Sequence, residues 1–134
     1  MKHILTCSFG KDSIATALLA LQHGEPLDEL VYSEVMFSDT VSGELPEHKR
    51  FIYETAIPYF EKRGIPTKIL RGQKTYLDCF YHIVSRGNAE GKLASFPLTG
   101  RCSIQRDCKL PPIRNYQKTL PQDTVYYCLL YTSP

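Results

Sequence analysis

The chain has 134 residues, of which 43% are hydrophobic and 22% are charged, and its formal net charge is +2 at pH 7. These values describe one ordinary globular domain with a modest core, and the small charge gives no support to nucleic-acid binding. No apolar run approaches the roughly 20 residues that cross a bilayer, so we expect no membrane partner.

The first predicted elements are a short strand at residues 2–8 and a helix at residues 12–23. Gly24 follows the helix, as glycine commonly does at a helix end. Because the N-terminus leads straight into this strand and the turn after it, we expect no cleaved signal peptide and a cytoplasmic protein. Four apolar residues of the helix share one face: Ile14, Ala17, Leu18 and Leu21.

The middle of the chain continues the alternation, with a strand at residues 30–37, a helix at residues 46–63 and a strand at residues 67–71. Pro46 suits the first turn of this helix. Pro58 lies inside it without an N–H to donate, so we expect a kink or a split there. Strands that alternate with helices at short spacing predict right-handed crossovers and a parallel sheet, and hence an α/β fold.

The last third of the chain is less regular and ends directly after a predicted strand. A parallel strand normally leads to a further helix, so we expect the natural protein to continue past about residue 128 and residues 1–134 to be one incomplete domain. Four segments are predicted here: a helix at residues 76–85, a long loop at 86–101, a helix at 110–118 and a strand at 124–131.

The turn between the first strand and the first helix reads Ser-Phe-Gly-Lys-Asp-Ser and has the features of an anion site. The start of a helix presents free N–H groups and a positive dipole end, which bind phosphate. Gly10 would let the backbone approach phosphate oxygens, and Ser8 and Ser13 would add hydroxyl donors. Lys11 adds a mobile charge, whereas Asp12 would cap the helix or help to hold Mg²⁺. The alternative is a capped turn with an exposed lysine.

This turn resembles the pyrophosphate loop of the adenine-nucleotide alpha-hydrolase superfamily, the PP-loop ATP pyrophosphatases, usually written Ser-Gly-Gly-x-Asp-Ser. Within that superfamily the chain most resembles the phosphoadenosine phosphosulfate (PAPS) reductase family, with Phe9 in place of the first glycine. The resemblance implies a three-layer, Rossmann-like PP-loop fold with strand order 3-2-1-4 and helices on both faces. It also implies that residues 8–13 hold the phosphates of ATP or of a PAPS-type nucleotide.

A second block, at residues 37–47, resembles the family segment Asp-Thr-Gly-x-x-Phe-Pro-Glu. Asp39 and Thr40 fit that segment, but this chain has one extra residue before its proline, and Val41 stands where glycine is expected. The resemblance implies that Asp39 and Thr40 belong to the nucleotide site, beside the adenosine. The alternative for Asp39 is an ordinary loop aspartate that starts a turn.

A third block, at residues 100–113, resembles the family segment Arg-x-Cys followed by Lys-x-x-Pro-Ile. It places Arg101, Arg106 and Lys109 within nine residues, and arginine suits bidentate contacts with phosphate or sulfate. We expect Arg101 and Lys109 to face the bound anion. The alternative is a solvated basic loop.

The chain has five cysteines, and an odd number in a cytoplasmic protein argues against a disulfide framework. Cys102 and Cys108 are separated by five residues, which is not the spacing of a zinc knuckle. Four thiolates for an iron–sulfur cluster would need Cys79 and either Cys7 or Cys128, and no spacing requires that set. We therefore expect ordinary thiols and no cluster, with Cys102 and Cys108 the weak candidates for a metal.

The resemblance leaves the reaction open. Sulfonucleotide reductases of this family use a cysteine in a Glu-Cys-Gly-x-His segment, which this chain lacks, together with a thiol reductant such as thioredoxin. The superfamily's other chemistry is attack on the ATP α-phosphate, with Mg²⁺ present. Two alternatives remain: an ATP-dependent adenylating or thiolating enzyme that acts on nucleic acid or a small molecule, and an inactive nucleotide-binding module of a larger assembly. No residue is assigned a catalytic role.

Overall fold

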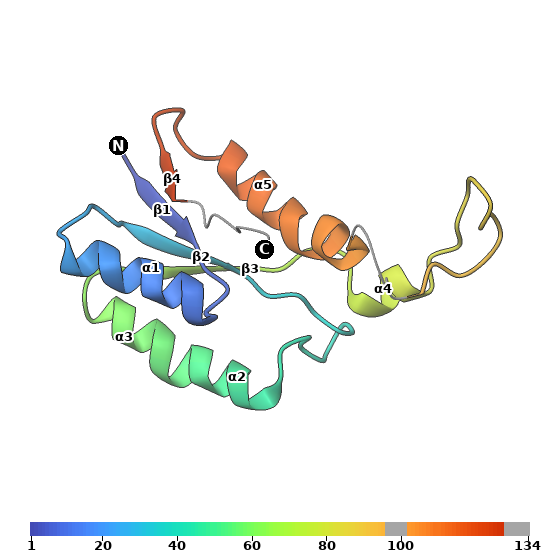
Figure 1. The fold of residues 1–134 in the computed structure, drawn as a ribbon, viewed down its shortest axis with the longest axis horizontal. Helices are drawn as coiled ribbons and strands as arrows, with labels where there is room; N and C mark the ends of the chain where they lie inside the picture. The colour runs from blue at the N-terminus through green and yellow to red at the C-terminus, as the bar shows by residue number, and fades with distance from the viewer. Residues whose placement is uncertain (96–101, 128–134) are drawn as a thin grey trace.

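The computed structural model describes residues 1–95 and 102–127, and these fold around one four-stranded sheet (Figure 1). All strand pairs are parallel and the strand order is β3-β2-β1-β4, which confirms the predicted α/β class and strand order. The strands are β1 (His3–Thr6), β2 (Glu29–Ser33), β3 (Thr67–Leu70) and β4 (Val125–Tyr127).

Helices cover both faces of the sheet, so the architecture has three layers. Figure 1 shows α1 together with α2 and α3 on one face and α5 on the other. In the described part of the chain, no helix has the length and apolar character needed to cross a membrane. The helices are α1 (Lys11–Gln22), α2 (Pro46–Phe51), η1 (Ile52–Ala56), α3 (Ile57–Glu61), α4 (Tyr76–Phe80), η2 (Gln105–Lys109) and α5 (Leu110–Lys118), where η marks a π-helical turn.

The main core lies between the sheet and the α1, η1 and α3 helices. Leu5 and Leu30 from the central strands are almost fully buried there, and they pack with residues such as Ala17 of α1 and Phe60 of α3. A second, smaller cluster lies under α4 and η2. Its buried members are Cys79, Ile104 and Cys108.

The predicted disturbance at Pro58 takes the form of a π turn, not a break. α2, η1 and α3 follow one another without interruption, and the junction residues Ile52 and Ala56 keep right-handed helical angles. A proline ring crowds the carbonyl four residues before it, and a π turn is one way in which a helix relieves such crowding. The helical segment ends at Glu61, close to the predicted end.

The other boundaries differ from the prediction mainly after β3. The helix predicted at residues 76–85 ends at Phe80, because the chain then folds back on itself through an antiparallel bridge between Ile83 and Leu93. The helix predicted to begin at Leu110 already begins at Ser103 and passes through η2. The second strand ends at Ser33, not at residue 37. The predicted residues 128–131 of the last strand lie outside the described residues.

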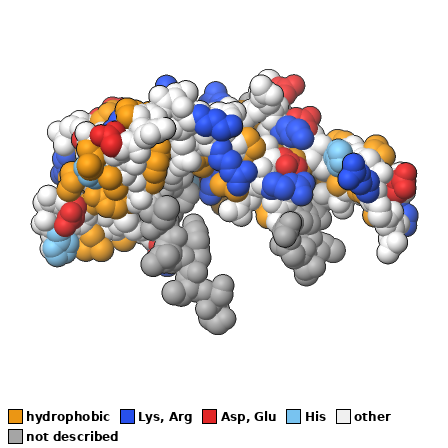
Figure 2. All heavy atoms as spheres, turned by 90° about the horizontal axis from the view of Figure 1, so that it is seen from above, with side chains coloured by type: hydrophobic (Ala, Val, Ile, Leu, Met, Phe, Trp, Pro, Cys, Tyr) orange, Lys and Arg blue, Asp and Glu red, His pale blue; other side chains and the backbone are white. Residues whose placement is uncertain are grey.

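The charged side chains form a mixed surface. Figure 2 shows Lys and Arg side chains over the middle of the face seen from above, with acidic side chains beside several of them. This interspersion agrees with the net charge of +2.

Candidate functional site

A cavity of about 710 Å³ opens at the carboxyl ends of β1 and β2. Its wall contains Ser8 after β1, Tyr32 and Ser33 of β2, Glu44 from the loop after β2, and Lys109 of η2. Ligands of open α/β sheets bind outside the carboxyl ends of the strands, and small-molecule cavities span about 300–1,000 Å³. The position and size of this cavity therefore make it the candidate site.

Phe9 anchors the predicted phosphate loop by its side chain. Its φ angle is +61°, in the left-handed region where glycine is the usual residue, which explains why a glycine suits this position. The phenyl ring is 1% exposed and meets the ring of Tyr32 edge-on, with centroids 5.4 Å apart. The side chain of Phe9 is therefore not available to a ligand.

Gly10 forms the N-cap of α1 with φ −77° and ψ 173°, a conformation that any residue adopts. A Cβ atom built on Gly10 would meet only Ser8 Oγ, at 3.6 Å. The helix has no side-chain cap, and by helix geometry the N–H groups of its first turn have no acceptor within the helix. The fold itself therefore gives no reason for glycine here, because an added Cβ would make only an ordinary van der Waals contact.

The three residues after Gly10 do not behave alike. Ser13 is buried and its hydroxyl donates to the Gly10 carbonyl at 3.2 Å, so this hydroxyl is used within the protein. Lys11 and Asp12 are exposed and form an ion pair at 2.9 Å, and the hydrogen bond that Lys11 donates to Asp12 raises the pKa of Lys11. Asp12 does not cap the helix, contrary to one of its two predicted roles. Neither Lys11 nor Asp12 lines the cavity.

Asp39 and Thr40 lie in an exposed turn away from the cavity wall. Ser38 Oγ accepts hydrogen bonds from the N–H groups of Thr40 and Val41, at 3.4 and 3.1 Å, and so closes this turn. The structure matches the turn interpretation of Asp39 and does not bring Asp39 or Thr40 to the cavity.

Gly43 and Glu44 contribute the cavity wall from this loop instead. A Cβ atom on Gly43 would lie 2.6 Å from the Val35 carbonyl oxygen and 2.8 Å from Tyr76 Cε2, so only glycine fits. Tyr32 donates its hydroxyl hydrogen bond to Glu44 at 3.1 Å, and burial followed by the charge of Glu44 raises the pKa of Tyr32. In the sequence, the glycine of Ser-Gly-Glu was the only sign that the backbone at residue 43 packs closely against Val35 and Tyr76.

The third predicted block reaches the site through Lys109 and Cys102, which both line the cavity. The Lys109 carbonyl accepts a hydrogen bond from Ser33 Oγ at 2.9 Å, which ties η2 to the end of β2. Arg106 instead pairs with Asp107 through two hydrogen bonds of 2.9 Å. Arg101 lies outside the described residues.

Cys102 and Cys108 do not share a site. Cys102 is exposed at the cavity, whereas Cys108 is buried against Cys79 in the second cluster. Within residues 1–95 and 102–127, no group of three or more His, Cys, Asp or Glu side chains could hold a metal ion.

Glu34 is an important residue of this region that the sequence did not reveal. It follows β2 directly and is 0% exposed, yet Arg71 donates to it through Nε and Nη2 at 3.0 and 2.7 Å. The Tyr53 and Ser42 hydroxyls donate to the same carboxylate at 2.9 and 2.7 Å, and Lys49 Nζ lies 3.7 Å away. Burial would raise the pKa of Glu34, but these hydrogen bonds outweigh it and lower the pKa. Glu34 therefore joins the loop after β2 to η1 and to the exit of β3.

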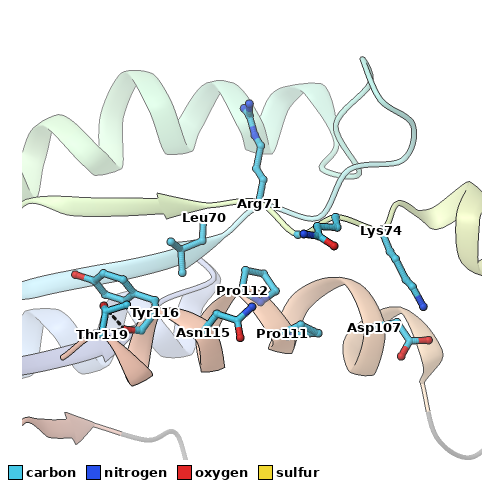
Figure 3. A pocket seen from close by; sticks show the side chains of 11 residues that line it. Leu70, Arg71, Lys74, Asp107, Pro111, Pro112, Asn115, Tyr116 and Thr119 are labelled. Atoms are coloured by element: carbon cyan, nitrogen blue, oxygen red, sulfur yellow. Dashed lines mark hydrogen bonds between the residues drawn. The ribbon is translucent and has the colours of Figure 1, made fainter. Parts of the chain in front are cut away.

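A second cavity, of about 580 Å³, lies between the exit of β3 and α5 (Figure 3). Pro112 and Tyr116 of α5 form one side, while Arg71 points away toward the other face of the sheet. A Cβ on Gly72 would lie 2.7 Å from the Cys108 carbonyl oxygen, so the β3 exit packs directly on η2. None of the predicted site residues within the described ranges lines this second cavity.

Comparisons with known proteins add no relative: no family model, curated protein or solved structure matches this chain. Its function is therefore argued from the geometry of the first cavity.

Proposed function

We propose that this chain binds an adenine nucleotide at the first cavity, with the phosphates at the start of α1. The observation that carries the proposal is the meeting of Ser8 and Lys109 on one cavity wall. Ser8 belongs to the turn that resembles a pyrophosphate loop, and Lys109 to the block that resembles the family's Lys-x-x-Pro-Ile segment. Two motifs that are far apart in the sequence thus each supply a residue to the wall of one cavity.

The chemistry of the wall suits the two ends of a nucleotide. Val35, Tyr76 and Ile104 give it apolar and aromatic surface on which a base can lie. The Lys109 ammonium and the N–H groups at the start of α1 provide donors for phosphate oxygens. The terminal phosphates would lie over Gly10, within reach of the flexible Lys11 side chain.

Mg²⁺ fits this arrangement through Asp12. Mg²⁺ is usually bound by one or two carboxylates together with substrate phosphates, and Asp12 presents an exposed carboxylate at the start of α1. A bound Mg²⁺ would neutralise charge on the phosphates. The residues of the chain would then act by positioning the nucleotide and stabilising its charge, which suits attack on the ATP α-phosphate.

Sulfonucleotide reduction is the second candidate, and Cys102 is the observation that favours it. Its thiol is exposed on the wall of the same cavity. In that reaction a thiolate bonds to the sulfonate sulfur, the S–O bond to the nucleotide breaks, and a dithiol reductant such as thioredoxin releases sulfite while becoming a disulfide. Pyrophosphate from ATP indicates the first reaction, sulfite the second, and tight binding without either product a binding module.

The test of the proposal is calorimetric titration of the full chain with ATP and with adenosine 3′,5′-bisphosphate. Lys109→Ala should weaken binding about tenfold or more, because a charge-assisted hydrogen bond contributes roughly 1.5–3 kcal/mol. Lys62→Ala is the matched control, since Lys62 follows α3 and lies before β3, at the opposite end of the sheet. Equal nucleotide affinities of the wild type and Lys109→Ala would show that Lys109 does not contact the nucleotide. That result would contradict the proposed function.

A further inference from the structure

Cys79 and Cys108 form a buried pair of thiols that does not belong to the nucleotide cavity. Their Sγ atoms lie 3.4 Å apart, and the two residues are 5% and 1% exposed. Cys79 belongs to α4 and Cys108 to η2, so the contact joins segments that are separated in the sequence. A disulfide bond is about 2.05 Å long, so the two sulfurs need only a small approach to form one.

A small cavity distinguishes Cys79 from Cys108. It has a volume of about 140 Å³, and its charged lining is mixed, with Lys74 and Arg106 beside Asp78 and Asp107; Cys79 lines it, whereas Cys108 does not. A water molecule occupies about 30 Å³ in the liquid, so a peroxide molecule fits this space. The cavity therefore gives a small oxidant access to Cys79 before Cys108.

The environment of Cys108 suits the second step of an oxidation. Burial, the hydrogen bond with Cys79 and the charge of Cys79 raise the pKa of Cys108 to about 12. The Cys108 thiol therefore keeps its proton at neutral pH. A neutral sulfenic acid at Cys79 would no longer carry that charge. The pKa of Cys108 would then be raised less, so that Cys108 would ionise more easily.

We propose that Cys79 and Cys108 are a peroxide-reactive pair, in which Cys79 is oxidised first and Cys108 then closes a disulfide. The Cys79 thiolate attacks one oxygen of hydrogen peroxide, the O–O bond breaks, and the released hydroxide takes up the former thiol proton as water. The Cys108 sulfur then bonds to the sulfenic sulfur, the S–O bond breaks, and a second water leaves with the Cys108 proton. Two thiols and one peroxide give one disulfide and two waters. This reaction does not depend on the proposed nucleotide binding.

The test treats the full chain with hydrogen peroxide, removes the excess with catalase, and alkylates the remaining thiols in denaturant. Trypsin then separates the cysteines, with Cys79 in residues 75–86, Cys102 in residues 102–106 and Cys108 in residues 107–109. Mass spectrometry should find residues 75–86 joined to residues 107–109, two hydrogens lighter than the sum of the free peptides. Brief treatment with dimedone present should label Cys79 and leave Cys108 unlabelled.

Variants separate this pair from a random oxidation. Cys108→Ser should leave Cys79 as a sulfenic acid that dimedone traps, and Cys102→Ser should still form the Cys79–Cys108 link. Cross-linking of Cys79 mainly to Cys102, or dimedone labelling of Cys108 before Cys79, would overturn the proposal. Full recovery of alkylated Cys79 and Cys108 from the peroxide-treated wild type would also overturn the proposal. This outcome does not depend on whether any variant folds.

Discussion

The ring of Phe9 packs edge-on against the ring of Tyr32, with centroids 5.4 Å apart. This contact joins the turn after β1 to the strand whose Tyr32 lines the first cavity. A buried aromatic pair therefore holds the loop that we propose to bind phosphates against the core. Its strained backbone is held in place by the packing of the side chain of the same residue.

Replacement of Phe9 by glycine tests which of these two effects is larger. Glycine would relieve the positive φ, worth about 1–2 kcal/mol, but would empty a buried aromatic site, which costs about 3–5 kcal/mol for Phe→Ala. We expect Phe9→Gly to lower the free energy of unfolding by about 2 kcal/mol or more in urea titrations. Phe9→Leu keeps most of the apolar volume and should lose less. Unchanged or increased stability of Phe9→Gly would show that backbone strain is the larger effect.

Gly10→Ala separates folding from ligand binding. Because Gly10 has extended angles and its added Cβ would make only a van der Waals contact with Ser8 Oγ, the free energy of unfolding should stay within about 0.5 kcal/mol of the wild type. Nucleotide affinity should fall about tenfold, since the new methyl group stands where phosphate oxygens would approach. Gly43→Ala is the matched control, and it should destabilise the fold because its Cβ would clash with the Val35 carbonyl. Wild-type affinity of Gly10→Ala in calorimetry would place the phosphates elsewhere.

Glu34→Gln tests the buried carboxylate and its dependence on pH. At about pH 7 the variant should be less stable by roughly 2 kcal/mol, since it loses charge-assisted hydrogen bonds, while Arg71, 54% exposed, can turn to water. The pKa of Glu34 is lowered in the folded state, so its contribution is fully present above the unfolded pKa of about 4.5 and is lost as the pH falls through the folded value. Urea unfolding should show the stability difference between the two proteins shrinking as the pH falls below about 4.5. A difference that stays constant with pH would contradict the role of the Glu34 charge.

Cys102 gives a chemical probe of the cavity. Its thiol is exposed on the cavity wall, whereas Cys108 is buried. Iodoacetamide should label Cys102 in the native protein, and saturating ATP should slow that labelling several-fold while Cys108 stays unmodified throughout. The rate is read from the tryptic peptides of residues 102–106 and 107–109. The same Cys102 labelling rate with and without ATP would argue against a nucleotide in this cavity.

The parallel sheet could be predicted because it depends on the local alternation of strands and helices and on the handedness of crossovers, whereas the strand order was implied by the family resemblance. The sequence also located the turn at residues 8–13 and Lys109, which the structure brings to one end of the sheet. It could not reveal Glu34, whose partners Ser42, Tyr53 and Arg71 come from three different segments. An acid at the end of an apolar strand carries no local sign that its partners will meet it.

In the loop after β2, the sequence pattern pointed to residues that do not reach the cavity. Asp39 and Thr40 fitted a sequence pattern, but the turn closed by Ser38 keeps them away from the cavity wall, and Gly43 and Glu44 take that place. Likewise, Cys108 of η2 is buried against Cys79 and does not meet Cys102, which precedes the helix and lines the first cavity.

Hydrogen–deuterium exchange of the full chain with and without ATP tests most directly that two distant motifs form one nucleotide site. We predict slower exchange on ATP binding in two regions at once, residues 8–13 and residues 102–109. Slower exchange confined to residues 70–74 and 111–119, which line the second cavity, would contradict the account, as would an unchanged pattern at saturating ATP.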